Sequence, residues 1–258
     1  MTPKEYSMLN VAPTISAILN VPVPAQSAGA PIAEIVHDLS GAARLALIAP
    51  DALGLFAWNL WKAEMPYLSS LHEQCSLVLR SVLPSITPVN FGAMVTGAGL
   101  EIHGSQTFKH NFTCETLFDT IRKAGGNSAG VGLDGYTGSA LLGRFADIWG
   151  NAGAGDDADV ERTVLEIAVR ERPTFIISQL GVVDDVFHRY GPSSPLVVPM
   201  LQDLDARLKR MVGQLKALGY VILILSDHGQ HDVNEPELKG THGTDSDIDC
   251  LVPCTWVS

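Results

Sequence analysis

The sequence lacks the features of a membrane or secreted protein. No apolar run approaches the roughly 20 residues that a helix needs to cross a bilayer, and the segment around Lys4 and Glu5 lacks the apolar core of a signal peptide. Cysteine is scarce, and the four residues show neither CxxC spacing nor the density of a disulfide framework: Cys75, Cys114, Cys250 and Cys254. We therefore expect a cytoplasmic protein with reduced thiols and no membrane partner.

Basic residues are also few. Lys and Arg together number 17 against 28 Asp and Glu, which gives a formal net charge of -11. This balance argues against a nucleic-acid surface as the main partner. An anionic ligand would need a local positive feature to hold it. Apolar residues, in contrast, make up 46% of the 258 residues, which is ample for a large core.

Buried strands and amphipathic helices are expected to alternate along the chain. The apolar runs predict strands at 42–49, 75–81, 128–133, 174–180, 220–225 and 250–256. Helical spacing of apolar residues predicts helices at 10–20 (which Asn10 can cap), 53–71 (broken at Pro66), 87–97, 117–124, 160–172 and 201–218. Residues 134–156, rich in Gly, Ala and Asp, are expected to form a mobile excursion. The alternation predicts one α/β domain over residues 1–258, a three-layer α/β/α sandwich with a mainly parallel sheet.

One stretch, residues 83–97, predicts a turn that delivers Thr87 to the start of a short apolar helix. Pro88 stands at an early helical position, where its missing N–H costs nothing. A hydroxyl group there faces unpaired backbone N–H groups and the positive end of the helix dipole, which suits a group that attacks or holds an anion. Thr87 is therefore the candidate nucleophile. The alternative is that Thr87 only caps the helix.

Acidic and histidine residues recur at the ends of predicted strands and in glycine-containing loops. Three Asp and three His have this setting: Asp51, Asp184, His188, Asp227, His228 and His242. Any one pair would be an ordinary surface feature or hydrogen bond. Together they have the composition of a ligand set for two divalent metal ions.

These segments give the sequence a resemblance to a known family. In chain order it has Asp51 after a strand, Pro-Ser-x-Thr at 84–87, Asp-x-x-x-His-x-Tyr-Gly-Pro at 184–192, Ser-Asp-His-Gly at 226–229 and Gly-Thr-His-Gly at 240–243. It resembles the alkaline phosphatase superfamily, especially its type I phosphodiesterase and nucleotide pyrophosphatase branch. The resemblance implies two divalent ions, zinc or else manganese, one held by Asp184, His188 and His242. The other would be held by Asp51, Thr87, Asp227 and His228.

The same resemblance implies a reaction. A small phosphodiester, nucleotide or related phosphate ester would be hydrolysed through a phospho-threonine intermediate on Thr87. Alternatives are a phosphomonoesterase, a phosphonate hydrolase or a non-catalytic metal-binding member of the fold. The sulfatase branch is disfavoured because Thr87-Pro88-Val89-Asn90-Phe91 stands where those enzymes have Cys/Ser-x-Pro-x-Arg.

The sequence departs from its relatives at the position expected to hold a phosphate oxygen. They place an Asn a few residues after a His-Gly pair, whereas this chain has Phe108 there. Asn90, Phe91, Lys109 and Asn111 are the candidate substrate-binding residues, although Lys109 and Asn111 could be solvated loop residues. A basic group at this place would favour monoesters, and its absence would favour diesters or nucleotides.

The second departure concerns chain order. Residues 10–24 resemble an Asp-Ile-Ala-Pro-Thr-Ile helix and loop that relatives place after the Gly-Thr-His-Gly segment, but here they precede Asp51. The chain is therefore predicted to be circularly permuted, with residues 1–40 equivalent to the C-terminal segment of relatives. The alternative is a coincidental amphipathic helix.

Overall fold

The computed structural model describes residues 6–258. Its strands are β1 (Tyr6–Ser7), β2 (Leu45–Pro50), β3 (Ser76–Arg80), β4 (Ser128–Gly132), β5 (Ile148–Asn151), β6 (Phe175–Leu180), β7 (Val221–Leu225), β8 (His231–Asp232), β9 (Gly240–Thr241) and β10 (Leu251–Val257). The helices before residue 130 are α1 (Val11–Leu19), α2 (Ala33–Leu39), α3 (Leu55–Trp61), α4 (Pro66–Gln74), α5 (Thr87–Thr96), α6 (Leu100–His103) and α7 (Leu117–Lys123). Those after it are α8 (Gly143–Phe145), α9 (Asp157–Arg170), α10 (Val182–Tyr190), α11 (Val198–Ala217) and α12 (Asp247–Cys250).

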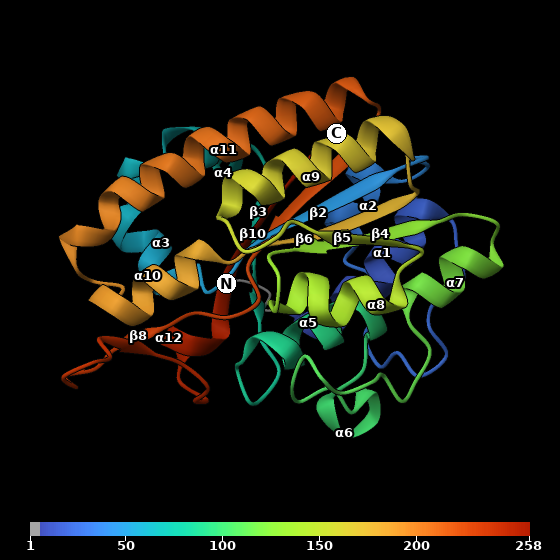
Figure 1. Cartoon of the computed structure of the whole chain (residues 1–258). Coiled ribbons are helices and arrows are strands. Elements are labelled where there is room, and N and C mark those ends of the chain that lie inside the picture. Colours follow the sequence, from blue (N-terminus) through green and yellow to red (C-terminus); the bar gives the residue numbers. More distant parts are fainter. Residues whose placement is uncertain (1–5) are drawn as a thin grey trace.

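The main sheet has eight strands in the order β1-β3-β10-β7-β2-β6-β4-β5. Every neighbouring pair is parallel except the two pairs that β10 makes with β3 and β7. Helices cover both faces, with α9 and α11 above the sheet in Figure 1 and α5 and α8 below it. The prediction of an α/β fold with a large, mainly parallel central sheet is confirmed.

The central strand β2 explains why both faces need helices. Its side chains alternate, so that Leu45, Leu47 and Ala49 join the core on one face while Ala46 and Ile48 join the core on the other. All six residues of β2 are buried. Strands that are apolar on both faces are typical of parallel sheets covered by helices.

The long helix α11 packs on the second of these cores. Its buried apolar side chains follow the predicted spacing of three and four residues: Leu201, Leu204, Leu208, Met211 and Leu215. Each such side chain contributes roughly 1.5–3 kcal/mol when it is fully removed from water. The stripe thus fixes α11 against the sheet and, beside it, the helix α9.

Helix α5 begins at Thr87, as predicted. Ile86 precedes it in an extended conformation, Pro88 lies in its first turn, and Gly97 ends it with a positive φ of 68°. Residues 89–96 are all buried. Because the helix is held on every side after its first turn, Thr87 is kept at a fixed position at its N-terminus.

The start of the chain differs in one detail from the sequence expectation. Asn10 was expected to cap the helix at 10–20, but its side chain makes no cap hydrogen bond to α1. Its Oδ1 instead accepts from the backbone N of Ser7 at 2.8 Å, and its Nδ2 donates to the carbonyl oxygen of Ala30 at 2.7 Å. A short 3₁₀ turn, Met8–Asn10, occupies the place of the expected cap.

The expectation of a mobile excursion at 134–156 is wrong. These residues contain a π-helix (Gly138–Leu142), the helix α8 and the strand β5, which pairs in parallel with β4 at the edge of the sheet. The segment is thus a structured part of the fold.

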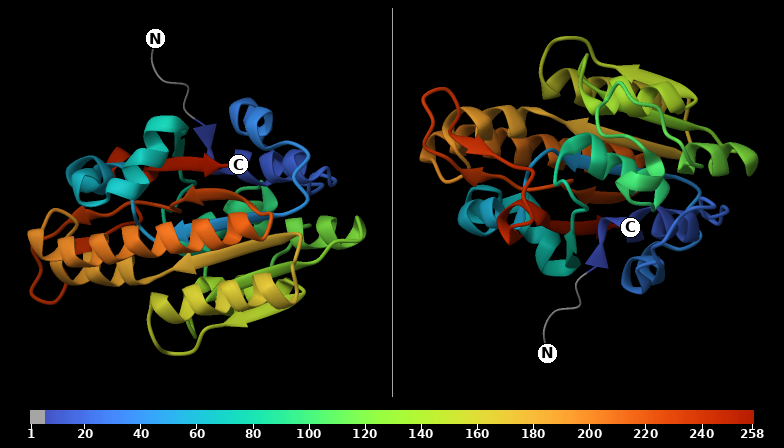
Figure 2. Two further views of the ribbon diagram at one scale, coloured as in Figure 1. Left: turned by 90° about the horizontal axis from the view of Figure 1, so that it is seen from above. Right: turned by 90° about the horizontal axis from the view of Figure 1, so that it is seen from below.

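The first and last strands of the described chain lie in the same half of the sheet. Strand β1 pairs with β3, and β3 pairs with the last strand, β10. The views from above and below in Figure 2 show β1 and β10 close together in projection. The register sets Tyr6 opposite Leu79 and Leu79 opposite Val252, so β1 lies level with the start of β10 and not with its end. Within residues 6–258, no helix has the length and apolar character needed to cross a membrane.

Candidate metal centre

Three adjacent strands of the sheet bring most of the predicted metal ligands together at their carboxyl ends. Asp51 directly follows β2, Asp227 and His228 follow β7, and α10, which carries Asp184 and His188, starts directly after β6. In the sheet, β7, β2 and β6 are neighbours. The carboxyl edge of a parallel sheet is the usual place for a site in such folds.

Two further segments, the start of α5 and the residue after β9, complete the arrangement. Thr87 is delivered by α5, and His242 follows β9. The β9 segment is tied to α10, because the backbone N of Lys239 donates to the carbonyl oxygen of His188 at 2.8 Å. His242 is in turn tied to the turn before α5 through a 3.0 Å contact between its Nδ1 and the carbonyl oxygen of Ser85.

One group of side chains converges on His228. Its Nε2 lies 3.5 Å from Asp51 Oδ1, 3.3 Å from Asp227 Oδ2 and 3.1 Å from Thr87 Oγ1. Thr87 Oγ1 also lies 3.5 Å from Asp51 Oδ1. Asp51, Asp227 and His228 are buried and could hold one metal ion.

A second group lies next to the first. Asp184 Oδ2 is 3.3 Å from His188 Nε2, and Asp184 Oδ1 is 3.6 Å from His242 Nε2. The rings of His242 and His228 stack with their centroids 4.0 Å apart. Asp184, His228 and His242 could hold a second ion. The two groups therefore share His228, and His188 lies against the carboxylate of the second group.

The three histidines have the tautomer that metal binding requires. In each ring Nδ1 faces a backbone carbonyl oxygen, which can only accept: His188 faces Gly240 at 2.8 Å, His228 faces Gly229 at 3.1 Å and His242 faces Ser85 at 3.0 Å. Nδ1 then carries a proton, and Nε2 is the ring atom that faces the carboxylates. In the metal-free protein a second proton can lie between Nε2 and a carboxylate, and a bound metal ion would take its place.

Among the described residues, the buried carboxylates have no lysine or arginine as an ion-pair partner. Burial raises the pKa of Asp51 well above its usual value, and the charges of Asp227 and Asp184 raise it further. Burial likewise raises the pKa of Asp227, whose Oδ2 has no hydrogen-bond partner among the described residues. The ion-pair partners given by the structure for these carboxylates are histidines alone. A divalent cation supplies the charge that such a donor set lacks.

The second group is electrostatically different. Burial and the neighbouring His228 lower the pKa of His242 to about 4, so this ring is neutral at neutral pH. Burial acts to raise the pKa of Asp184, but the hydrogen bond from His188 and the nearby histidines lower it overall. The same hydrogen bond raises the pKa of His188. A metal ion must therefore compete with a proton at His188, whereas the His242 ring is already unprotonated at neutral pH.

Two of the predicted substrate-binding residues are in the interior. Asn90 and Phe91 are both 0% exposed. The Asn90 side chain accepts from the backbone N of Val82 at 2.8 Å and donates to the carbonyl oxygens of Val82 and Ile86 at 3.2 Å. Asn90 thus holds the turn before α5, and Phe91 packs in the core. The substrate-binding prediction for these two residues is wrong.

The other two predicted substrate-binding residues, Lys109 and Asn111, lie in the exposed loop between α6 and α7. The Lys109 ammonium is 5.8 Å from the centroid of the Phe108 ring. Asn111 Oδ1 accepts a 3.3 Å hydrogen bond from Arg144, whose guanidinium also donates to the carbonyl oxygens of Phe108 and His110. Their contact with substrate stays a prediction.

Comparison with known proteins decides the family. A profile described as type I phosphodiesterase / nucleotide pyrophosphatase matches residues 115–246, just over half of the chain. The chain belongs to this family. The match includes Asp184, Asp227 and His242, while Asp51 and Thr87 lie before it. A comparison with curated protein sequences finds no match.

Solved structures of phosphodiesterase-family and phosphonate-hydrolysing proteins share the fold. Human ectonucleotide pyrophosphatase/phosphodiesterase 5 is 14% identical with a TM-score of 0.66, over 83% of this chain and 87% of its own. An inactive form of the murine protein with a threonine-to-alanine replacement, in complex with AMP, is 13% identical with a TM-score of 0.65, over 82% and 87%. Phosphonoacetate hydrolase from Sinorhizobium meliloti 1021, in complex with phosphonoacetate, is 19% identical with a TM-score of 0.58, over 75% and 58%.

Two buried glutamines at this phosphodiesterase-family site escaped the sequence reasoning. Gln179 Nε2 donates to Asp51 Oδ2, and Gln230 Nε2 donates to Asp184 Oδ1 at 2.5 Å. A signal for Gln179 was available, because it is a long polar residue in a buried strand that is otherwise apolar except for Ser178. Gln230 directly follows the Ser-Asp-His-Gly segment and carries no comparable signal.

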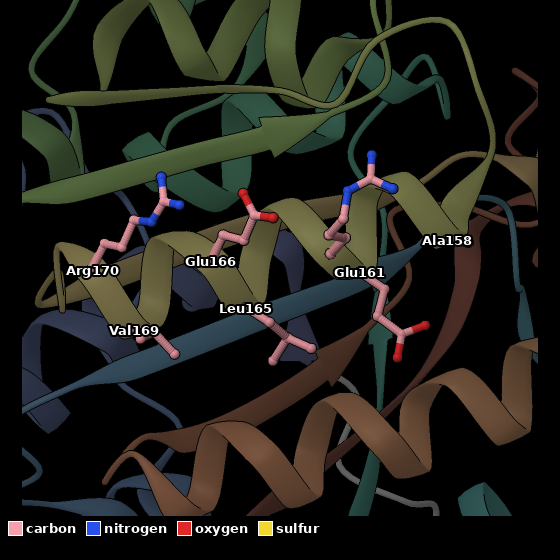
Figure 3. Close-up of a pocket in the computed structure, with 7 residues that line it drawn as sticks. Ala158, Glu161, Leu165, Glu166, Val169 and Arg170 are labelled. Carbon is pink, nitrogen blue, oxygen red and sulfur yellow. The ribbon is translucent and has the colours of Figure 1, made fainter.

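A separate hollow of about 450 Å³ lies along α9, away from the predicted ligands. It is lined by residues of that helix alone: Ala158, Glu161, Arg162, Leu165, Glu166, Val169 and Arg170. Figure 3 shows Glu161 and Leu165 extending towards α11, whereas Glu166 and Arg170 extend to the other side. Glu161 pairs with Arg207 and Arg210 of α11 at 3.0 and 2.8 Å. This hollow has no metal-binding chemistry comparable to that of the strand ends.

Proposed function

We propose that this member of the phosphodiesterase family is a two-metal phosphohydrolase with Thr87 as its nucleophile. Its substrate would be a small phosphodiester, a nucleotide or a related phosphate ester. The observation that supports this most directly is the position of Thr87 Oγ1, 3.1 Å from His228 Nε2 and 3.5 Å from Asp51 Oδ1. The hydroxyl group is thus beside two of the proposed ligand atoms and at the N-terminus of a helix.

The residues that would hold the two ions are those predicted from the sequence. Asp184, His188 and His242 would hold one ion, and Asp51, Thr87, Asp227 and His228 would hold the other. Zinc suits the mixture of imidazole and carboxylate ligands, and manganese is the alternative. When bound, such ions polarise phosphate oxygens and lower the pKa of a coordinated hydroxyl group.

The chain's own residues define the reaction steps. In the resting state Thr87 Oγ1 donates its hydrogen bond to Asp51 Oδ1. In the first step Oγ1 gives its proton to solvent water and bonds to phosphorus, and the bond from phosphorus to the leaving oxygen breaks. The leaving oxygen takes a proton from water. In the second step a water oxygen bonds to phosphorus and displaces Thr87 Oγ1; one proton of that water passes through solvent to Oγ1, and the other stays with the released phosphate.

Two relatives support the assignment of nucleophile and substrate. The murine structure is an inactive form in which a threonine is replaced by alanine, and it contains AMP. The phosphonoacetate hydrolase complex favours a second candidate, cleavage of a phosphonate by the same machinery. A phosphomonoesterase and a non-catalytic metal-binding protein are the further alternatives.

The test measures turnover by protein that has been stripped of metal and then given zinc or manganese. A chromogenic phosphodiester, the matching monoester and phosphonoacetate are the substrates. Thr87→Ala should lose turnover, while Thr163→Ala, a matched change on α9 where Oγ1 bonds the carbonyl oxygen of Asp159 at 2.8 Å, should keep it. Retained turnover in Thr87→Ala would contradict the proposal. Metal binding without turnover of any substrate would favour the non-catalytic alternative.

We also propose that residues 1–258 form a single, circularly permuted domain, in which residues 1–40 take the place of the relatives' C-terminal segment. In support, β1 is separated from β10 only by β3, and α1 shares a core with β10 through Ile15 and Val252. The rearranged chain would start at Gly41, in an exposed turn, and join Ser258 to Met1 through a flexible linker. It should fold and keep metal-dependent turnover, whereas a chain opened inside β6 should not. Failure of both rearranged chains to fold would reject the proposal.

We propose that the protein is cytoplasmic. All four cysteines are free thiols, which suits a reducing compartment. Alkylation of all four in protein denatured directly from cells would support this, and a disulfide would contradict it.

A further inference from the structure

Two buried glutamines contact the carboxylates of the two proposed metal sites, one at each. Gln179 lies on β6 and is 2% exposed, and Gln230 lies after β7 and is 1% exposed. Gln179 Nε2 donates to Asp51 Oδ2, while Gln230 Nε2 donates to Asp184 Oδ1. Neither glutamine has a role in the reaction steps described above.

The orientation of the Gln179 amide is fixed from its other side. Its Oε1 accepts from the backbone N of Gly138 at 2.6 Å. A backbone N–H can only donate, so the Nε2 group must face the carboxylate of Asp51. Because Oδ2 of Asp51 is occupied by this bond, the other oxygen, Oδ1, is the one that faces His228 and Thr87.

Gln230 makes both of its hydrogen bonds to a single residue. Its Nε2 donates to the side chain of Asp184 at 2.5 Å and to the carbonyl oxygen of Asp184 at 3.3 Å. Its Oε1 is buried and has no partner among the described residues. An unpaired buried oxygen destabilises the fold, so packing stability does not account for a glutamine at this place. The contact with Asp184 does.

We propose that Gln179 and Gln230 are positioning residues, which hold Asp51 and Asp184 in their metal-binding orientations and thereby set the affinity of each metal site separately. The proposal rests on the proposed function in one respect only, that these carboxylates bind metal. A carboxylate turns freely about its last side-chain bond unless a second hydrogen bond fixes its plane. Loss of such an outer partner lowers metal affinity by about ten- to a hundredfold.

The test compares Gln179→Met, Gln230→Met and their double variant with wild type, using holoprotein. Methionine has nearly the same length and volume but cannot donate a hydrogen bond. Gln202→Met is the matched control, because Gln202 is an exposed glutamine on α11 that bonds Glu64 at 2.9 Å. Affinities for two zinc ions are measured by titration against a competing chelator, and the cobalt-substituted protein is followed by its visible absorption.

Each single variant should lower the affinity for one of the two zinc ions by about ten- to a hundredfold and leave the affinity for the other unchanged. The double variant should lower both affinities. The cobalt spectrum should change in each variant, and excess metal should restore any turnover. Gln202→Met should match wild type. Gln230→Met should unfold at the wild-type temperature or above it, because it removes an unpaired buried oxygen, so its loss of affinity cannot be a loss of folding.

The possible failures are distinguishable. Wild-type affinity for both ions in Gln179→Met and Gln230→Met would overturn this inference and leave the proposed function intact. A wild-type protein that binds zinc but hydrolyses no ester would refute the proposed function, while the affinities of the variants would still decide this inference. A wild-type protein that binds no divalent metal would overturn both.

Discussion

Replacing Asp227 by asparagine should have opposite effects on the metal-free and the metal-bound protein. Asp227 is 0% exposed, and its Oδ1 accepts from the backbone N of Ala52 at 3.1 Å. Its Oδ2 has no hydrogen-bond partner among the described residues and faces His228 Nε2 at 3.3 Å. Asparagine keeps the oxygen that Ala52 needs, removes the buried charge and can donate to the lone pair of His228.

The expected sizes follow from these contacts. An unpaired buried polar group costs about 1–3 kcal/mol, so the metal-free variant should be more stable by about that amount. For a chain of this size each kcal/mol raises Tm by about 2–4 °C. With zinc at about a hundred times its Kd, an ion adds about 2.7 kcal/mol of stability to the wild type. Asparagine is a neutral ligand, and most of that gain should be lost.

Scanning calorimetry with chelator and then with zinc measures both effects. The control is Asp205→Asn, because Asp205 is also buried but accepts from the backbone N atoms of Tyr67 and Leu68 at the start of α4. That change should lower Tm equally with and without zinc. The reasoning would be refuted if Asp227→Asn lowered the Tm of the metal-free protein as the control does, or if zinc raised its Tm as much as that of wild type.

Three further predictions concern pH and packing. A hydrogen bond to the carboxylate of Asp184 raises the pKa of His188. In the metal-free protein this hydrogen bond therefore stabilises the fold at low pH, and the stabilisation is lost as the pH rises through the raised pKa. Zinc needs the unprotonated ring, so zinc affinity should fall by up to about tenfold per pH unit below the same pKa, as titrations at about pH 6 and 8 would measure. Gly138→Ala should destabilise by about 1–3 kcal/mol in denaturant unfolding, because a Cβ would lie 2.3 Å from the carbonyl oxygen of Val131. Arg207→Met should cost about 1.5–3 kcal/mol in the same assay, because it removes a buried charged hydrogen-bond partner of Glu161, which keeps its pairing with Arg210.

The sequence was most informative where local pattern and tertiary role coincide. Strands β2 and β7 are apolar on both faces, and β6 is apolar apart from Ser178 and Gln179, so their runs of Leu, Ile and Val are visible without knowledge of their neighbours. Asp51 and Asp227 follow β2 and β7, and adjacent parallel strands end at one edge. The convergence of these residues could therefore be predicted from the order of elements.

Features that depend on distant partners could not be predicted in the same way. Strand β10 was expected from its apolar run, but its antiparallel direction is set by pairing with β3 and β7, which the run does not encode. Asn90 is a similar case. A polar residue one turn after Thr87 has the spacing of a substrate ligand, yet its amide holds the backbone at Val82, a contact fixed by the turn before α5.

The glycine-rich segment shows how a correct observation led to a wrong interpretation. Abundant Gly at 134–156 predicts mobility, but glycine also allows two backbones to approach closely. A Cβ at Gly138 would meet the Val131 carbonyl oxygen at 2.3 Å, and one at Gly130 would meet the backbone N of Gly143 at 2.6 Å. The close approach brings the N–H of Gly138 to Gln179, and Gln179 to Asp51. Packing at the edge of the sheet is thereby linked to the orientation of Asp51, a proposed metal ligand at its centre. A substitution at Gly138 that moves its N–H group should therefore alter the orientation of Asp51 through the side chain of Gln179.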